Sequence, residues 1–282
     1  MKKAILVAII GAMTLGVNAG DWGKAPVPAK APIEECVDIG GSISAGYMTD
    51  YVFYGVRFAR DSVWTDVNYT FDNLIVPINV GAWYLNGITP AGVDELDLYV
   101  SAELGTYYGF DVSLGYTHYF FPEVAGLGSY GEIGLDISRS FSIVDFAWET
   151  NYAFTERNTV PVASTGGGWY HQASLSKTFG ITDAVSLVIT GGAGWTNGYW
   201  NSGYAGLVGV ANGPGGTLTR GNGFSHYFVT AELPIELNCR ATLTPYISYN
   251  GTPTGSVVNN ISTVAGGSSD VLSGGVSLSV SF

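Results

Sequence analysis

The sequence predicts an all-β protein, a transmembrane antiparallel up-and-down β-barrel of about twelve strands. Three observations lead to this fold class. Apolar residues recur with a period of two over most of the chain. Charged residues make up only 12%, while aromatics reach 13%, glycines number 40 and the mean hydropathy is +0.23. No stretch after the first nineteen residues is apolar for the ~18 residues that a membrane-spanning helix needs. A barrel reconciles these facts, because only every second residue of each strand faces lipid.

Residues 1–19 have the three-part order of a secretory signal peptide. Lys2 and Lys3 are followed by an apolar run and then by Val17-Asn18-Ala19, a small-residue cleavage site. The run is shorter than the ~20 residues of a spanning helix, which favours cleavage over an uncleaved anchor. Removal would leave 263 residues starting at Gly20, enough for one large domain.

Residues 20–36 mix Pro, Ala and Lys without an apolar period, which predicts an extended periplasmic linker ahead of a barrel over residues 37–282. Cys36 and Cys239 are the two cysteines of the chain. Both fall at the same predicted end of the barrel. In an oxidising compartment they favour one disulfide that ties the linker beneath the barrel, the alternative being two unpaired thiols.

Alternation is clearest from Leu96 to Leu104, where every second residue is apolar and Asp97, Tyr99, Ser101 and Glu103 stand between. The pattern predicts one lipid-facing side and one polar side. The twelve expected strands are 42–56, 62–71, 74–85, 94–107, 110–120, 129–139, 143–154, 168–178, 185–195, 224–236, 241–250 and 271–282.

The connections between these strands alternate between short and long, as in outer-membrane barrels, and an even strand number places both termini on the periplasmic side. The connection expected at 57–61 is the one that fits least well, because it is a short outer loop. Pro77, Pro234 and Pro245 fall inside expected strands. Since proline has no N–H for the ladder, they predict local bulges.

The chain closes on Val276 to Phe282, strict alternation with a terminal aromatic. This resembles the C-terminal strand by which the barrel-insertion machinery recognises outer-membrane proteins, with Phe282 as the signal. An ordinary last strand of a soluble β-protein is the alternative.

The run Thr49-Asp50-Tyr51-Val52-Phe53-Tyr54-Gly55-Val56 resembles the opening of the TorF-like porin family, which typically reads SDYVFRGIS. Tyr54 stands where the family usually has Arg, and Thr49 where Ser is common. The match covers under a tenth of the chain. It implies an outer-membrane barrel of porin type, with no catalytic residues to carry over.

The predicted lumen is strongly acidic, and no strand-central Lys or Arg points inward. Carboxylates in a narrow water-filled passage concentrate cations. The sequence therefore predicts passive diffusion of small, preferentially cationic or neutral solutes across the outer membrane. The alternative is a non-conducting structural or surface-interaction barrel that uses the outer loops or the 20–36 linker as its contact. Inward Trp64, Tyr99, Phe228 and Tyr246 would constrict or plug the passage. The expected pore-lining residues are Asp66, Asp97, Glu103, Glu132, Asp136, Asp145, Glu149 and Glu232.

Other chemistries find less support. The pI of about 4.4 and a formal charge of −12, or −14 without Lys2 and Lys3, disfavour nucleic acid. No Asp-x-Asp-x-Asp-Gly spacing predicts a metal site, and no cofactor is expected. An enzyme is not expected either. Of the histidines His118, His171 and His226, the last follows Ser225, and neighbours on a strand point to opposite faces.

The aromatic, Gly-rich segment 196–223 is expected to be an outer loop. It would fold into the barrel mouth, meet a sugar or partner, or remain a simple surface loop.

Overall fold

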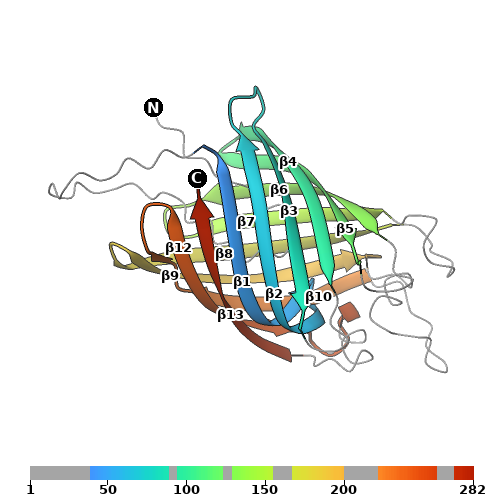
Figure 1. The fold of residues 1–282 in the computed structure, drawn as a ribbon. Coiled ribbons are helices and arrows are strands. Elements are labelled where there is room, and N and C mark those ends of the chain that lie inside the picture. The colour runs from blue at the N-terminus through green and yellow to red at the C-terminus, as the bar shows by residue number, and fades with distance from the viewer. Residues whose placement is uncertain (1–38, 89–93, 123–128, 155–166, 200–221, 259–269) are drawn as a thin grey trace, which may run out of the picture.

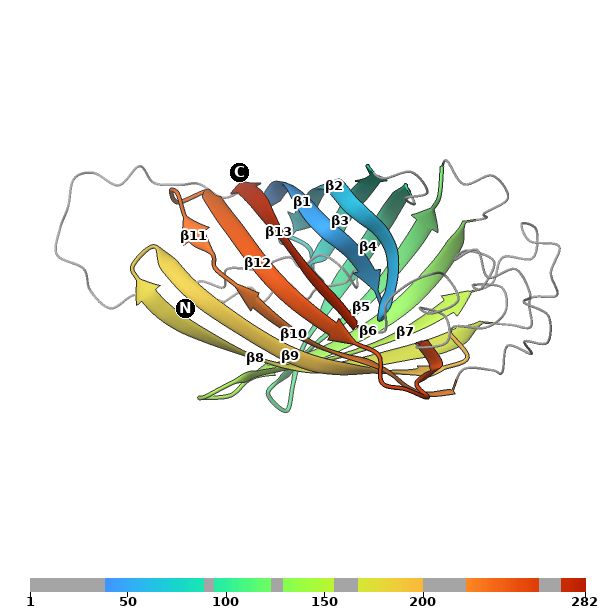
Figure 2. The same cartoon turned by 90° about the horizontal axis from the view of Figure 1, so that it is seen from below.

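The computed structural model describes residues 39–88, 94–122, 129–154, 167–199, 222–258 and 270–282. They form one antiparallel sheet of thirteen strands that wraps round into a barrel (Figures 1 and 2). The strands are β1 (Gly41–Phe53), β2 (Val56–Phe71), β3 (Ile78–Gly87), β4 (Glu95–Tyr107), β5 (Phe110–Phe120), β6 (Tyr130–Ser140), β7 (Asp145–Phe154), β8 (Gly168–Thr182), β9 (Val185–Asn197), β10 (Asn222–Glu232), β11 (Ile235–Glu236), β12 (Ala241–Gly251) and β13 (Asp270–Ser281).

The sheet closes because β1 pairs with β13, from Ser42 opposite Ser281 to Met48 opposite Gly275. The short β11 does not occupy a separate strand position in the barrel. Like β10, it pairs with β9 on one side and β12 on the other. β10 and β11 thus form one interrupted strand of the barrel. Counted in this way, the barrel has the twelve strands predicted from the alternation.

Two prolines lie beside the break between β10 and β11. Pro234 lies between β10 and β11, and Pro245 lies in β12 with its carbonyl accepting from the Leu233 N–H at 2.9 Å. The missing N–H of Pro245 therefore falls opposite the break, where the ladder is already irregular. Pro77 was expected inside a strand, which is wrong. It precedes β3, and its carbonyl accepts from the Glu103 N–H at 3.0 Å.

The expected outer loop at 57–61 is also wrong. These residues belong to β2, and the strands β1 and β2 are joined by the two residues Tyr54 and Gly55 alone. Both have positive φ, 47° and 86°. Two such residues make the two-residue turn whose twist matches that of antiparallel strands, so no longer loop is needed.

The outer surface of the barrel is apolar. Leu98, Val100 and Leu114 are 40–45% exposed, whereas Ser101 and Ser113 on the other face are buried. Apolar side chains outside and polar ones inside is the arrangement that a β-barrel in lipid requires. Nowhere in the described part of the chain does a helix reach the length and apolarity that would let it cross a membrane.

A charge placed in the middle of this apolar surface should be costly. We expect Leu114→Arg to lower the free energy of unfolding in lipid by about 2–4 kcal/mol, because the guanidinium loses water. Leu237→Arg is the matched control, since Leu237 lies in the turn after β11 and is 55% exposed. Denaturant titration of the protein in vesicles measures both. Equal costs for the two variants would contradict the assignment of the lipid-facing side.

Candidate functional site

The β1–β2 hairpin leaves the barrel wall and crosses the interior. Its tip, Tyr54, contacts Asn151 on β7, Tyr170 on β8 and Ser225 on β10. β7 and β8 lie on the other side of the closed sheet from β1, whereas β10 is separated from β1 only by β13 and β12. We call residues 49–60 the inner hairpin.

The turn at the tip is set by local sequence, whereas its location is not. Tyr108 and Gly109 form the same kind of turn between β4 and β5, with φ values of 54° and 81°. Tyr108 is 98% exposed, but Tyr54 is only 4% exposed. A tyrosine with positive φ is unfavourable by itself, so the contacts around Tyr54 must hold it in place.

Those contacts combine stacking with hydrogen bonds. The Tyr54 ring stacks on Tyr170 with a centroid distance of 3.6 Å. Asn151 donates through Nδ2 to the Tyr54 hydroxyl at 2.7 Å, and the Ser225 hydroxyl donates to the Tyr54 carbonyl at 3.1 Å. A Cβ on Gly55 would lie 2.7 Å from Cβ of His226, so the tip touches the wall of β10 directly. The tip is thereby fixed on three sides.

Glu132 on β6 is the polar centre of the contact. Its carboxylate accepts from the hydroxyls of Tyr54 at 3.3 Å, Tyr119 at 3.2 Å and Tyr199. The side chain is 3% exposed. Burial removes the water molecules that would hydrate this carboxylate. The three hydroxyl donors take their place.

The flank of the inner hairpin packs on the wall of β3 and β4. The Tyr51 ring lies 5.6 Å from that of Trp83, and its hydroxyl donates to Glu95 at 2.8 Å. Glu95 is 3% exposed. It was not among the expected pore-lining residues, although it has the same parity as Asp97 and so the same inward direction.

The eight acidic residues expected to line a pore all lie on the side of the sheet opposite the exposed apolar residues. Asp66 accepts from Tyr99 at 2.8 Å and from Asn68 at 2.9 Å. Asp136 and Glu149 are directly opposite each other on β6 and β7. Whether these residues line a conducting pore stays a prediction.

The acidic residues do not form one site. Glu132 belongs to the inner hairpin contact, whereas Glu103, Asp145 and Glu232 lie toward the end with the short turns. Among the described residues, Oδ1 of Asp97, Oδ1 of Asp145 and Oε1 of Glu149 are buried without a hydrogen-bond partner.

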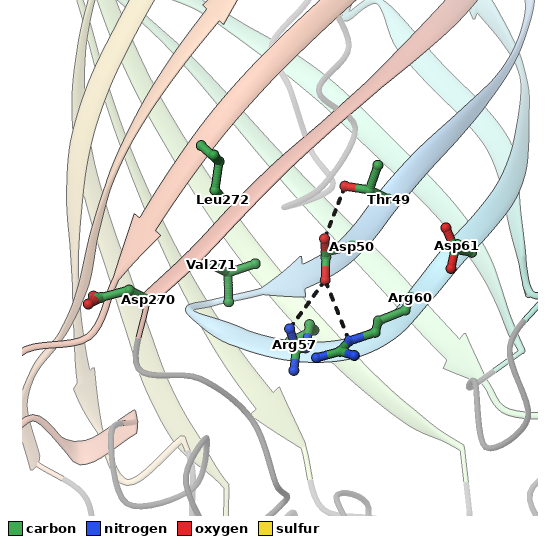
Figure 3. A pocket seen from close by; sticks show the side chains of 8 residues that line it. All are labelled: Thr49, Asp50, Arg57, Arg60, Asp61, Asp270, Val271 and Leu272. Atoms are coloured by element: carbon green, nitrogen blue, oxygen red, sulfur yellow. Dashed lines mark hydrogen bonds and ion pairs between the residues drawn. The ribbon is translucent and has the colours of Figure 1, made fainter.

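The inner hairpin carries two positively charged side chains, Arg57 and Arg60. Arg57 and Arg60 approach Asp50 at 3.3 and 3.9 Å (Figure 3). They line a pocket of about 390 Å³ between the inner hairpin and β13. Asp50 balances one of these two positive charges, and Asp61 lines the same pocket.

The expected separation of Ser225 and His226 is wrong. A register shift between Phe224 and Tyr227 brings both side chains into the interior, 0% and 3% exposed, with 3.3 Å between the hydroxyl and Nδ1. The Ser225 hydroxyl donates its hydrogen bond to the Tyr54 carbonyl, so it does not donate to His226. The pair therefore supports the inner hairpin. In the described ranges, no three His, Cys, Asp or Glu side chains are grouped so that they could hold a metal ion.

At the other end of the barrel, Cys239 lies in the turn before β12 and is disulfide-bonded. Cys36, the predicted signal peptide and the predicted 20–36 linker lie outside the described residues, as does most of the segment 196–223. Phe282 is bonded to the start of β1, because its N–H donates to Gly41 and its carbonyl accepts from Ile39, both at 2.9 Å. Its role as an insertion signal stays a prediction.

Sequence reasoning missed the inner hairpin. One signal was present in the sequence. The strands expected at 94–107 and 110–120 leave Tyr108-Gly109 as a two-residue connection, and Tyr54-Gly55 is the same dipeptide. Nothing local could show that one turn is exposed and the other buried.

No protein-family model matches the chain, and no curated protein does. Solved structures match it in fold. An outer-membrane channel from Pseudomonas putida F1 covers 90% of this chain and 100% of its own, with a TM-score of 0.50 and 7% identity. The chain has the fold of an outer-membrane channel.

Two further barrels show similar coverage. The NanC porin covers 86% of this chain and 100% of its own, with a TM-score of 0.49 and 12% identity. The KdgM porin, solved in complex with disordered oligogalacturonate, covers 86% and 99%, with a TM-score of 0.49 and 7% identity. At such identities the likeness concerns the fold alone, and the TorF-like similarity stays a resemblance of residues 49–56.

Removing the carboxylate at the hairpin contact should destabilise the protein. We expect Glu132→Ala to lower the free energy of unfolding by about 2–4 kcal/mol, since three buried tyrosine hydroxyls lose their acceptor. Glu236→Ala is the matched control on the exposed β11, where little change is expected. Thermal and denaturant unfolding in detergent provides the comparison. An unchanged stability for Glu132→Ala would show that Glu132 does not hold the inner hairpin.

Proposed function

We propose that this protein is an outer-membrane channel for small, preferentially cationic or neutral solutes, with both barrel termini in the periplasm. The observation that carries the proposal is the sign of the interior charge. Asp66, Glu95, Glu132 and Glu232 are each at most 9% exposed on the inner side. The arginines of the inner hairpin already share Asp50.

The physical reason is electrostatic. Fixed carboxylates inside a low-dielectric wall create a negative potential, which raises the local concentration of cations and lowers that of anions. Neutral solutes would be limited by the width of the passage alone. The fold of an outer-membrane channel supports the proposal, and the resemblance to TorF-like porins agrees with it.

The partners follow from the same reasoning. The apolar outer surface suits lipid acyl chains, the last strand suits the barrel-insertion machinery, and small solutes would occupy the lumen. The protein would act without a cofactor, without nucleic acid and without catalysis.

One observation favours the second candidate, a non-conducting structural or surface-interaction barrel. The inner hairpin packs its aromatic residues against buried tyrosines of the opposite wall, and Tyr170 and Tyr199 are 0% exposed. A hairpin held permanently in this position would restrict the path through the barrel.

Single-channel recording of the refolded protein in planar bilayers separates the two candidates. We expect stable conductance steps and a cation-selective reversal potential under a KCl gradient. Changing Asp97, Glu103 and Asp145 to Asn, Gln and Asn should move the reversal potential toward zero, because three interior charges are lost.

A double variant of exposed turn residues is the control. Asp72→Asn and Asp183→Asn remove formal charges from the turns after β2 and β8, and should leave the reversal potential unchanged. If protein shown to be folded and inserted gives no conductance, the channel proposal is contradicted and the structural barrel is the better account.

A further inference from the structure

The inner hairpin is attached to the barrel wall at two defined points. β1 pairs with β13 only as far as Met48 opposite Gly275, although β13 continues along β12 up to Asp270 opposite Gly251. Pairing between β2 and β3 begins at Ser62, opposite Gly87, and does not include the preceding residues of β2. Residues 271–273 of β13 thus have β12 on one side, while β1 has turned away on the other.

The backbone departs from a regular ladder at both points. Asp61 has a φ of 49°, in the region that L-residues seldom adopt, and its side chain accepts from the Tyr47 hydroxyl at 2.6 Å. Its carbonyl still accepts from Ile88 at 2.8 Å. On the other strand, the Thr49 hydroxyl accepts from the Gly274 N–H at 3.0 Å, a position that a β1 carbonyl would fill if pairing continued.

The sequence of β1 fits a second position as well as the observed one. Odd-numbered residues of β1 in the wall face outward, as Ile43 and Tyr47 do with 46% and 36% exposure. Tyr51 and Phe53 continue this alternation but are 2% and 4% exposed, because the strand has entered the barrel.

Continuing the β1–β13 register by the same rule would place Thr49 opposite Gly274 and Tyr51 opposite Leu272. Leu272 is 65% exposed on the outer face. In that position Tyr51 and Phe53 would become outward aromatics near the rim, where such residues are favoured in membrane barrels. Asp50 would face the lumen.

We propose that the inner hairpin is a gate, which exchanges between the docked position and an open position in which it lies in the wall, paired with β13. The proposal rests on the channel function given above. The pocket between the inner hairpin and β13, lined by Asp50, Arg57, Val271 and Leu272 among others, is the space that the hairpin closes as it moves (Figure 3). The docked position is the major one, since Tyr54 and Glu132 hold it there, and the open position is a minor state.

Distances between spin labels test the movement directly. One label replaces Arg60 on the inner hairpin, whose side chain is 59% exposed, and the other replaces Asp183 in the exposed β8–β9 turn on the far side of the barrel. Arg57 keeps its ion pair with Asp50 in this background, and the disulfide-bonded Cys239 does not react with the label. The docked state gives one dominant distance.

Weakening the tip should populate the open state. We expect Tyr54→Ala to add a second, longer distance and to raise the open probability of the channel by about tenfold or more, since a ring stack and buried hydrogen bonds are lost. Tyr108→Ala, in the exposed turn of the same kind, should change neither. If Tyr54→Ala does not fold, Asn151→Ala removes one of the same hydrogen bonds while leaving the hairpin sequence intact.

The outcomes separate the gate from the channel. A second distance without any conductance would keep the gate and overturn the proposed channel function. A single, unchanged distance in folded Tyr54→Ala and Asn151→Ala would overturn the gate, whatever conductance is measured. A second distance together with the rise in open probability supports both.

Discussion

Closure of the backbone ladder is the constraint on which the structure depends. In an apolar slab, an unpaired N–H or C=O costs several kcal/mol, on the order of 2–7, so the edges of the sheet must meet. β1 and β13 meet over seven residue pairs, from Ser42 opposite Ser281 to Met48 opposite Gly275. The alternation of each strand, the outward apolar residues and the inward carboxylates all follow from that closed wall.

The seam between β1 and β13 is also where the wall ends early. The inner hairpin leaves the seam and finds other partners inside the barrel, above all Tyr170, Asn151 and Glu132. Its apolar and hydroxyl groups are thereby buried as well as they would be in a soluble core. The molecule therefore contains a small aromatic core within a barrel whose remaining interior is polar.

Three of the interior carboxylates are hydrogen-bonded by tyrosine hydroxyls. Tyr51, Tyr99 and Tyr119 each donate to a carboxylate, on Glu95, Asp66 and Glu132 respectively. A hydroxyl on a ring gives a buried carboxylate a donor without adding a positive charge. This chemistry adds no positive charge to the interior while it anchors the inner hairpin, and it links the proposed selectivity to the proposed gate.

The sequence by itself determined the barrel, because the period of two in segments such as Leu96 to Leu104 is a local property that survives in any closed sheet. It also determined the inward direction of Asp97 and its counterparts, since parity along a strand fixes the face. The tertiary structure alone decided where the β1–β2 hairpin goes. Tyr54-Gly55 and Tyr108-Gly109 are identical dipeptides in similar turns, yet one is buried and the other exposed. The difference lies in partners more than seventy residues away, Glu132, Asn151 and Tyr170, and no local pattern in a sequence reports such contacts.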